Sequence, residues 1–508
     1  MLAHGVVGDG MSGRQCKGNG ETCGSSLEGG RSQSPHRTGA VQSIWIAEGR
    51  GSKTRLRDGG QEGGDVTDGS KQQSAGSAEV ATQGAEAAGE FAWVEAAIWT
   101  ERMLSALRNG VKGGKWFSLM DKVYAPKSLL AAWTKVRANK GAAGVDGQSV
   151  ERFAARADDY LAELSAALRE GTYQPQAVKR VDIPKGDGKT RPLGIPVVKD
   201  RIVQTALKML LEPIFEVGFR DGSYGFRPGR GCHDALREVD RLLKDGNTFV
   251  VDADLQGYFD SIPHDKLMAQ VEVKVSDGRV LGLLRGFLGQ DILKGTERWT
   301  PTGGTPQGAV ISPLLANIYL DPLDALMAGQ GFAMVRYADD FVILTRSREE
   351  ADQALELVAG WVKANGLTLH PSKTHVGDCR QLGEGFDFLG YRFEAGRRTV
   401  RKKSLASLKD RIRARTKRTQ GVGLARVVQD LNPILRGWFG YFKHAHPYTF
   451  KGLDGFVRRR LRALLRKQEK RPGRGRAKAD HIKWPNAFFA KAGLFELDTA
   501  WSLARQPR

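Results

Sequence analysis

Three features that define other protein classes are scarce or missing in this sequence of 508 residues. No run of 18 or more apolar residues occurs, which argues against a transmembrane helix, and the N-terminus lacks the apolar core of a signal peptide. No two cysteines form a C-x-x-C pair, so neither a zinc knuckle nor a disulfide framework is indicated. The sequence therefore predicts a cytoplasmic protein. Its four cysteines are Cys16, Cys23, Cys232 and Cys379.

Acidic residues are outnumbered, with 57 Asp and Glu against 78 Lys and Arg and a formal net charge of +21. Such an excess destabilises a compact state by self-repulsion unless a polyanion neutralises it. Segment 397–478 alone carries 26 Lys and Arg against four acidic residues. Apolar residues at helical spacing within 405–412 and 461–465 predict two basic amphipathic helices there. We therefore expect a nucleic-acid-binding helical domain, with a solvated basic surface as the alternative.

Aromatic residues are almost absent from positions 1–90, which hold 20 glycines and the single aromatic Trp45. Such a stretch cannot bury enough apolar area to offset its ordering entropy, so a disordered tail is predicted. Apolar spacing predicts helices from 91 to 170, and alternating β-type and helical runs predict an α+β region over 171–395. The basic helical domain then occupies 396–478, and 479–508 forms a short C-terminal tail.

Two adjacent acids, Asp339 and Asp340, interrupt two apolar β-type runs within 332–344. The pattern predicts a β-hairpin with both carboxylates at its turn. Carboxylates between segments that favour burial repel each other and lose hydration, and a divalent cation removes that cost. Taken alone, the pair also fits an ordinary acidic hairpin turn.

A second apolar run, 249–262, leads into Asp252 and Asp254, with Asp260 further on. Two-metal phosphoryl transfer needs carboxylates from separate elements around ions roughly 3.5–4 Å apart. Because Asp254 and Asp339 lie 85 positions apart, only neighbouring strands could bring them together. Asp252 and Asp254 share one face of a strand by alternation, and the local pattern does not choose between them.

Taken together, these segments resemble the palm motifs of the group II intron-encoded reverse transcriptase/maturase family. Residues 337–340 match its YADD box, and residues 254–260 match its D-[IL]-x-x-x-F-D box, whose first Asp is a metal ligand. The resemblance favours Asp254 over Asp252. It implies that Asp254, Asp339 and Asp340 are the catalytic residues and the ligands of two Mg²⁺ ions.

Further boxes follow in the family's order, at 183–196, 223–230, 304–313, 366–373 and 386–391. The resemblance implies that Lys185 and Arg191 grip the incoming triphosphate and that Gln307 lies near the nucleotide. Phe259 resembles the steric gate that excludes a 2′-hydroxyl, which makes the substrate a deoxynucleotide. The alternatives are solvated hairpin charges for the two cations and a core aromatic for Phe259.

Segment 397–478 resembles the thumb and maturase domain of the same family. Arginine beside aromatic residues suits RNA, whose unpaired bases stack on guanidinium and aromatic planes. Ordinary helix packing is the alternative for Trp438, and equally for Tyr441 and Phe442. The residues assigned to RNA binding are Arg436, Trp438, Arg458, Arg459 and Arg460.

The resemblance implies a right-hand polymerase fold of the α+β class. Residues 91–170 would extend the fingers, 171–395 would form the fingers and a palm with an antiparallel sheet, and 396–478 would be the α-helical thumb and maturase domain. The expected activity is RNA-directed DNA polymerisation, combined with binding of the chain's own group II intron RNA in splicing and mobility. The implied partners are an RNA template, a DNA primer or target and dNTPs, in a bacterial-type cytoplasm.

Two other functions also fit parts of the sequence. One is an RNA-binding splicing factor that has lost polymerisation, although its mark would be degenerate carboxylates and all three are present. The other is a retron or diversity-generating reverse transcriptase. The diversity-generating group typically shows Ser-Gln where this chain has Ser312-Pro313, and the basic segment argues against both lineages.

Overall fold

The computed structural model describes residues 91–186 and 189–505. The predicted disordered tail at 1–90 lies outside the described residues. No helix in the described part of the chain is both long and apolar enough to cross a membrane.

The first described segment is helical, as its apolar spacing predicts. Leu129, Trp133 and Val136 lie on one face of α4 and are buried, and this face packs against α7. The glycine-rich segment 141–147 contains no helix. The helices are α2 (Glu101–Asn109), α3 (Met120–Tyr124), α4 (Pro126–Asn139), α5 (Val150–Ala154), α6 (Ala157–Glu170) and α7 (Val198–Glu216).

A long antiparallel hairpin separates α6 from α7. Its strands β1 (Val178–Gly186) and β2 (Lys189–Ile195) form a four-stranded sheet in the order β2-β1-β4-β5. The short strands β4 (Ile292–Lys294) and β5 (Glu297–Trp299) complete this sheet, and β4 runs parallel to β1.

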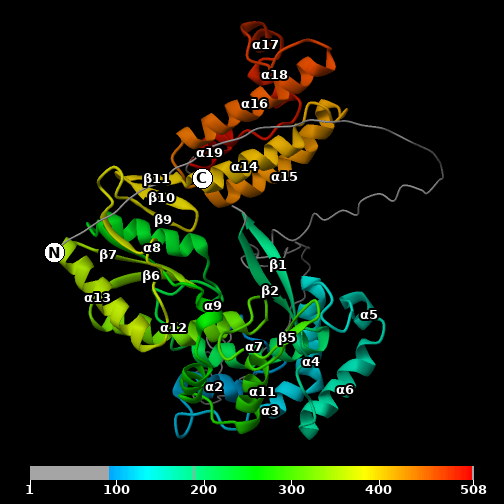
Figure 1. Cartoon of the computed structure of the whole chain (residues 1–508), viewed down its shortest axis with the longest axis vertical. Helices are drawn as coiled ribbons and strands as arrows, with labels where there is room; N and C mark the ends of the chain where they lie inside the picture. The colour runs from blue at the N-terminus through cyan, green and yellow to red at the C-terminus, as the bar shows by residue number, and fades with distance from the viewer. Residues whose placement is uncertain (1–90, 187–188, 506–508) are drawn as a thin grey trace, which may run out of the picture. The chain divides into compact units, whose positions relative to one another are not determined.

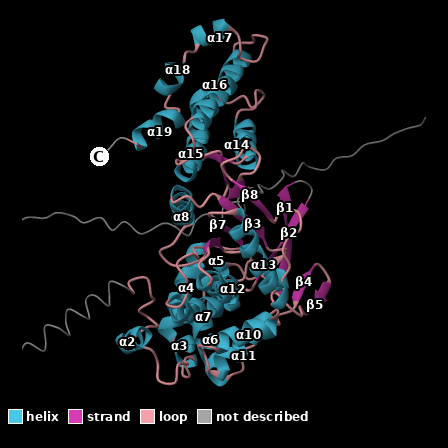
Figure 2. Cartoon of the chain, turned by 90° about the vertical axis from the view of Figure 1, so that its left-hand side faces the viewer, coloured by secondary structure: helices cyan, strands magenta, loops and turns pink. Residues whose placement is uncertain are grey.

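The central sheet carries the acidic motifs. Its order is β6-β7-β3-β8, and each neighbouring pair is antiparallel. Figure 2 shows β3, β7 and β8 beside one another. The predicted hairpin at the acidic pair is confirmed, because β6 and β7 are joined by a two-residue turn. The strands are β3 (Phe249–Asp254), β6 (Ala333–Tyr337), β7 (Asp340–Thr345) and β8 (His375–Asp378).

The central sheet lies between two hydrophobic cores, because successive side chains of a strand point to opposite faces. Val251, Phe341 and Ile343 belong to the core shared with α4, α7 and the helices that follow β3. Val250 and Val342 belong to a second core shared with α8 and the C-terminal helices. The surrounding helices are α8 (Cys232–Lys244), α9 (Tyr258–Ser261), α10 (His264–Glu272), α11 (Gly278–Leu288), α12 (Ser312–Gly329) and α13 (Arg348–Ala364).

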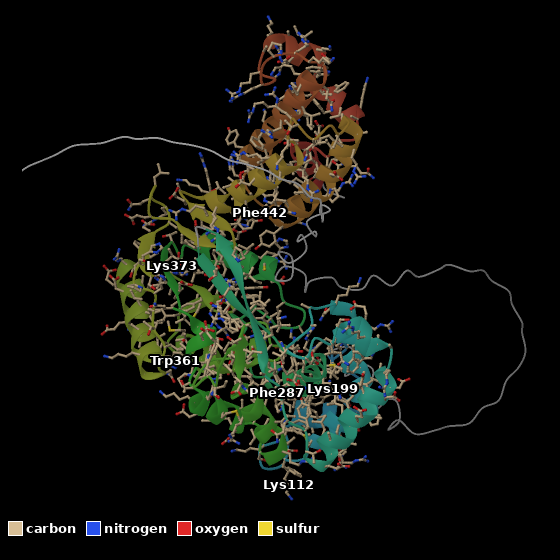
Figure 3. All side chains as sticks on the ribbon, turned by 45° about the vertical axis from the view of Figure 1, so that its right-hand side comes forward. Lys112, Lys199, Phe287, Trp361, Lys373 and Phe442 are labelled. Carbon is tan, nitrogen blue, oxygen red and sulfur yellow. The ribbon has the colours of Figure 1, made fainter. Side chains whose placement is uncertain are left out.

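The C-terminal part begins with a small antiparallel sheet and continues as helices. The two predicted basic amphipathic helices are confirmed as α14 and α16, which lie alongside α15 in Figure 1. Phe442 at the end of α15, labelled in Figure 3, has its ring centroid 5.1 Å from that of Tyr391 in the small sheet. The elements are β9 (Phe386–Phe388), β10 (Tyr391–Glu394), β11 (Arg397–Val400), α14 (Lys402–Arg415), α15 (Leu424–Phe442), α16 (Tyr448–Gln468), α17 (Lys478–Lys483), α18 (Asn486–Lys491) and α19 (Leu497–Ala504).

Candidate active site

The acidic residues of two distant motifs meet at one end of the central sheet. Asp254, the last residue of β3, is the cross-strand partner of Asp340, the first residue of β7. Directly opposed residues in an antiparallel pair project their side chains to the same face. Asp339 occupies the turn that precedes Asp340. The prediction that neighbouring strands would unite these motifs is therefore confirmed.

The carboxylates at this end of the sheet repel one another. Burial, together with the charges of Asp252, Asp339 and Asp254, raises the pKa of Asp340 to about 7. Burial and the charges of Asp387 and Asp254 likewise raise the pKa of Asp252 to about 7. Ionised carboxylates in such surroundings need a compensating cation. The site is therefore one that a cation stabilises.

One cation of the chain already contacts this group. The ammonium of Lys373, labelled in Figure 3, forms an ion pair with Asp254. The backbone supports this approach, because the His370 N–H donates to the Asp254 carbonyl oxygen over 2.8 Å. As the side chains stand, the described residues contain no group of three or more His, Cys, Asp or Glu placed to hold a metal ion. The donors nevertheless fit Mg²⁺ chemically, since it prefers carboxylate oxygens and a cation lies against one of them.

Asp252 lies further from the turn than Asp254 does. Its cross-strand partner is Val342, and its carboxylate accepts a hydrogen bond from the Asp387 backbone. The imidazole of His375 lies beside this carboxylate, with Nδ1 4.0 Å from Oδ2 of Asp252. The register thus supports the choice of Asp254, which alternation alone could not make.

Two of the predicted nucleotide-binding residues come together at α9, which contains Phe259. Gln307 donates from Nε2 to Oδ2 of Asp260 over 3.3 Å. The residue before Asp260 is Phe259, a partly buried side chain whose carbonyl oxygen accepts the Thr305 N–H over 2.6 Å. Gly304 lies so close to Asp260 that an added Cβ would approach its backbone to 2.9 Å. The two motifs therefore form one tightly packed unit.

The hairpin β1–β2 reaches the same unit through its backbone. The Gly194 N–H donates to the Gln307 carbonyl oxygen over 2.6 Å. Arg191 is exposed on β2, opposite Ile183 in the register. The side chain of Lys185 lies outside the described part of the structure. The roles of Arg191 and Lys185 toward a triphosphate remain predictions.

Comparison with known proteins shows which family the chain belongs to. The model of the family "Reverse transcriptase (RNA-dependent DNA polymerase)" matches residues 183–393, and that of "Group II intron, maturase-specific domain" matches residues 405–483. Protein YkfC of Escherichia coli (strain K12) is 35% identical over 323 residues, which cover 54% of this chain and 82% of YkfC. The chain belongs to the group II intron-encoded reverse transcriptase/maturase family.

Group II intron-encoded protein LtrA of Lactococcus lactis subsp. cremoris is 38% identical over 202 residues. That match covers 39% of this chain and only 33% of LtrA. Among solved structures, a chain of a partial Cas6-RT-Cas1--Cas2 complex is 25% identical to this chain. The match covers 49% of this chain and 41% of that one, with a TM-score of 0.31. This low score adds nothing to the family assignment.

The maturase-specific domain contains the residues predicted to bind RNA. Arg436 is exposed on α15, with its guanidinium carbon 5.5 Å from the ring centroid of Phe495. Trp438 is only 9% exposed, and its ring lies 4.7 Å from that of Phe442 and 6.3 Å from that of Phe450. This burial favours the packing alternative for Trp438, whereas RNA contact by Arg436 stays a prediction.

The three consecutive arginines of α16 have different surroundings. Arg458 forms an ion pair of 3.1 Å with Glu496, and Arg460 donates to the hydroxyl of Thr416 over 2.9 Å and to its carbonyl oxygen over 2.8 Å. Arg459 instead lies over the ring of Phe456, 5.4 Å from its centroid. The structure thus gives Arg458 and Arg460 internal partners, and of the three Arg459 is the best placed for an external ligand.

Sequence reasoning assigned no role to Lys373 or Arg336. Both stand inside motifs that were recognised, but their partners Asp254 and Asp324 come from other elements. For Arg336 a signal exists, because a charged residue inside an apolar strand is almost never fully buried unless it is paired. For Lys373 no pattern in the sequence indicates Asp254.

Proposed function

We propose that this chain is an RNA-directed DNA polymerase that also binds its own group II intron RNA and assists splicing and mobility. The polymerase assignment rests on one observation above all. The β3–β7 register sets Asp254 opposite Asp340 beside the turn that contains Asp339. In this proposal residues 171–395 are fingers and palm, extended by 91–170, and 396–478 are the thumb and maturase domain.

Asp254, Asp339 and Asp340 would hold two Mg²⁺ ions. The chemistry that these ions supply when bound is activation of the primer 3′-hydroxyl and neutralisation of charge on the pyrophosphate leaving group. The fold itself brings the three aspartates together at one end of the central sheet, so the backbone that carries them is in position before substrate arrives. Such preorganisation avoids reorganisation cost during the reaction.

The remaining groups would bind and select the nucleotide. Lys185 and Arg191 on the β1–β2 hairpin would contact the triphosphate, because two cations beside a glycine turn can converge on one phosphate group. Gln307 would orient the nucleotide from its position beside Asp260, which its hydrogen bond supports. Phe259 would exclude a 2′-hydroxyl by its bulk.

The polymerase proposal is tested by extension of a DNA primer on an RNA template. We expect the purified full-length chain to add dNTPs in the presence of Mg²⁺ and to stop when the ion is chelated. Tight RNA binding without any extension would contradict the proposal. That result is what a splicing factor with lost polymerase activity would give.

A cation-ringed aromatic residue supports the RNA-binding part of the proposal. Phe456 on α16 is half-buried, and three cations lie around its ring: Lys409 at 5.8 Å, Arg413 at 5.5 Å and Arg459 at 5.4 Å from the centroid. We call these four residues the α14/α16 seam. Cations held over an aromatic ring can contact RNA phosphates, and guanidinium planes can stack on unpaired bases.

The positive charge of this seam is poorly compensated. Arg413 forms an ion pair with Asp410, but both side chains are more than half exposed, and exposed pairs are worth about 0–1 kcal/mol. Burial and the nearby charges of Arg459 and Arg413 lower the pKa of Arg460. Repulsion of this kind is relieved by a polyanion. The seam therefore favours RNA as the partner of this region.

Neutralising the seam should weaken the salt dependence of RNA binding. We expect the double variant Arg413→Gln/Arg459→Gln to reduce the slope of log affinity against log salt by roughly 0.7 to 0.9 for each RNA phosphate that these arginines neutralise in the wild type. The measurement is fluorescence anisotropy with a labelled single-stranded RNA at several salt concentrations.

Arg458→Gln is the control, because it removes one positive charge from the position before Arg459, where Glu496 is the partner. It should leave the slope nearly unchanged and lower the thermal midpoint instead. Equal slopes for the wild type and the double variant would contradict the assignment of the seam to RNA.

A further inference from the structure

Arg336 is a fully buried arginine immediately before the catalytic hairpin turn. It lies in β6 with an exposed fraction of 0%, on the face of the central sheet opposite the carboxylates. Its Nε donates to Oδ1 of Asp324 over 2.7 Å, and its Nη2 pairs with the other oxygen of the same carboxylate. Although burial lowers the pKa of Arg336, the Asp324 charge raises it above its usual value, so the guanidinium stays charged.

The third nitrogen of Arg336 connects this ion pair to the turn itself. Nη1 donates to the carbonyl oxygen of Ala338 over 2.9 Å and to Oδ1 of Asn317 over 3.0 Å. Asn317 on α12 in turn donates from Nδ2 to the carbonyl oxygen of Gly225 over 2.7 Å. Helix α12, strand β6, the turn and the segment around Gly225 therefore share one hydrogen-bonded network.

The segment around Gly225 also closes on the turn through its backbone. The Tyr224 N–H donates to the Arg336 carbonyl oxygen, and the Arg336 N–H donates to that of Gly222, both over 2.8 Å. A Cβ on Gly225 would overlap the backbone nitrogen of Ala338. The turn therefore has little room to change its conformation while this segment remains in place.

The turn needs such support because its first residue is strained. Ala338 has φ of +61°, in the left-handed region, which is unfavourable for a residue with a Cβ. Strained backbone of this kind persists only where the surrounding structure over-determines it. The hydrogen bond from Arg336 to the Ala338 carbonyl acts at the peptide that leads into Asp339.

Stability alone does not account for the network. A buried ion pair often contributes no more than well-packed apolar residues of similar volume would, because desolvation offsets the attraction. The charged pair instead contributes hydrogen bonds of defined geometry, because the planar guanidinium donates in fixed directions to Asp324, Asn317 and Ala338.

We propose that Arg336, Asp324 and Asn317 are positioning residues that fix the turn at Ala338 and so set the direction in which Asp339 and Asp340 present their carboxylates. None of the three is placed to touch substrate. The inference rests on the proposed polymerase function for its kinetic consequence. Its structural consequence, a rigid turn, stands independently of activity.

The test is Arg336→Lys in the full-length chain. Lysine keeps a positive charge beside Asp324 but lacks the planar fork needed to reach Asn317 and the Ala338 carbonyl together. We expect hydrogen–deuterium exchange in a peptide spanning 337–345 to become about tenfold faster. We also expect kcat for dNTP addition to fall about 100-fold, with KM and RNA affinity nearly unchanged.

Arg462→Lys is the matched control. Its guanidinium is also buried, at 2% exposure, and donates to the Trp484 carbonyl oxygen and to Asn486 Oδ1, both over 2.9 Å. This change should lower the thermal midpoint without altering exchange at 337–345 or kcat. If Arg336→Lys does not fold, Asn317→Ala removes the Gly225 link and one acceptor of Arg336 Nη1 but keeps the pair with Asp324, and it should act in the same direction with a smaller effect.

Unchanged exchange at 337–345 in a folded Arg336→Lys or Asn317→Ala variant would overturn the inference. Faster exchange there with unchanged kcat would overturn it as well, because the turn would then not control the carboxylates. A wild-type chain that fails to extend a primer would contradict the polymerase function, but the exchange experiment would still decide whether the network fixes the turn.

Discussion

Asp254→Asn is expected to reduce extension of a primer on an RNA template by about 10³-fold or more, whereas Asp252→Asn should keep activity within about tenfold. Asp254 stands opposite Asp340 at the end of β3, so its loss removes a carboxylate from the group that would hold Mg²⁺. Asp252 lies two residues further from the turn. Its charge raises the pKa of Asp340, so removing that charge relieves repulsion there.

The two variants form a closely matched pair, because they make the same isosteric change on the same face of the same strand. Single-nucleotide incorporation under single-turnover conditions measures the chemical step for both. Comparable losses at the two positions would show that the strand end has no special role. A larger loss at Asp252 than at Asp254 would reverse the assignment of the ligand.

Phe259→Val is expected to raise the incorporation of ribonucleotides relative to deoxynucleotides on the order of 100-fold, the scale on which shape alone rejects a hydroxyl group. Phe259 is held in place through its carbonyl oxygen, which accepts the Thr305 N–H, and it precedes Asp260, the partner of Gln307. Shortening the side chain should therefore open space beside the nucleotide without displacing α9.

The readout is the ratio of kcat/KM for a dNTP to that for the matching rNTP. Tyr258→Phe is the control, because Tyr258 is the neighbouring aromatic, with ring centroids 5.5 Å apart, and its hydroxyl donates to the Ala316 carbonyl oxygen. That variant should lose stability and keep the sugar preference. Should Phe259→Val behave in the same way, the core-aromatic alternative would be correct.

The sequence predicted the parts of the fold that depend on local pattern. Apolar runs on both sides of Asp339 and Asp340 indicated a hairpin, and the register confirms one. Helical spacing in the basic segment indicated α14 and α16. Alternation could not separate Asp252 from Asp254, because both lie on one face. Only the pairing of β3 with β7 shows which of them faces the acidic pair.

The remaining features depend on contacts between residues far apart in the chain. Lys373 reaches Asp254 across 119 positions, and Arg458 on α16 pairs with Glu496, the residue before α19. In the sequence, consecutive arginines predict a uniform basic surface. Only the packing shows which of them already have partners within the protein. The burial of Trp438 between α15 and α16 likewise follows from helix packing, which the sequence offered only as an alternative.

We propose that the carboxylates on β3 and at the β6–β7 turn catalyse DNA synthesis on RNA. The most direct test compares the purified chain with Asp339→Ala for extension of a DNA primer on an RNA template, with RNA affinity measured on the same samples. We predict extension by the wild type, none by Asp339→Ala, and equal RNA affinity for both. Extension retained by Asp339→Ala would contradict the account.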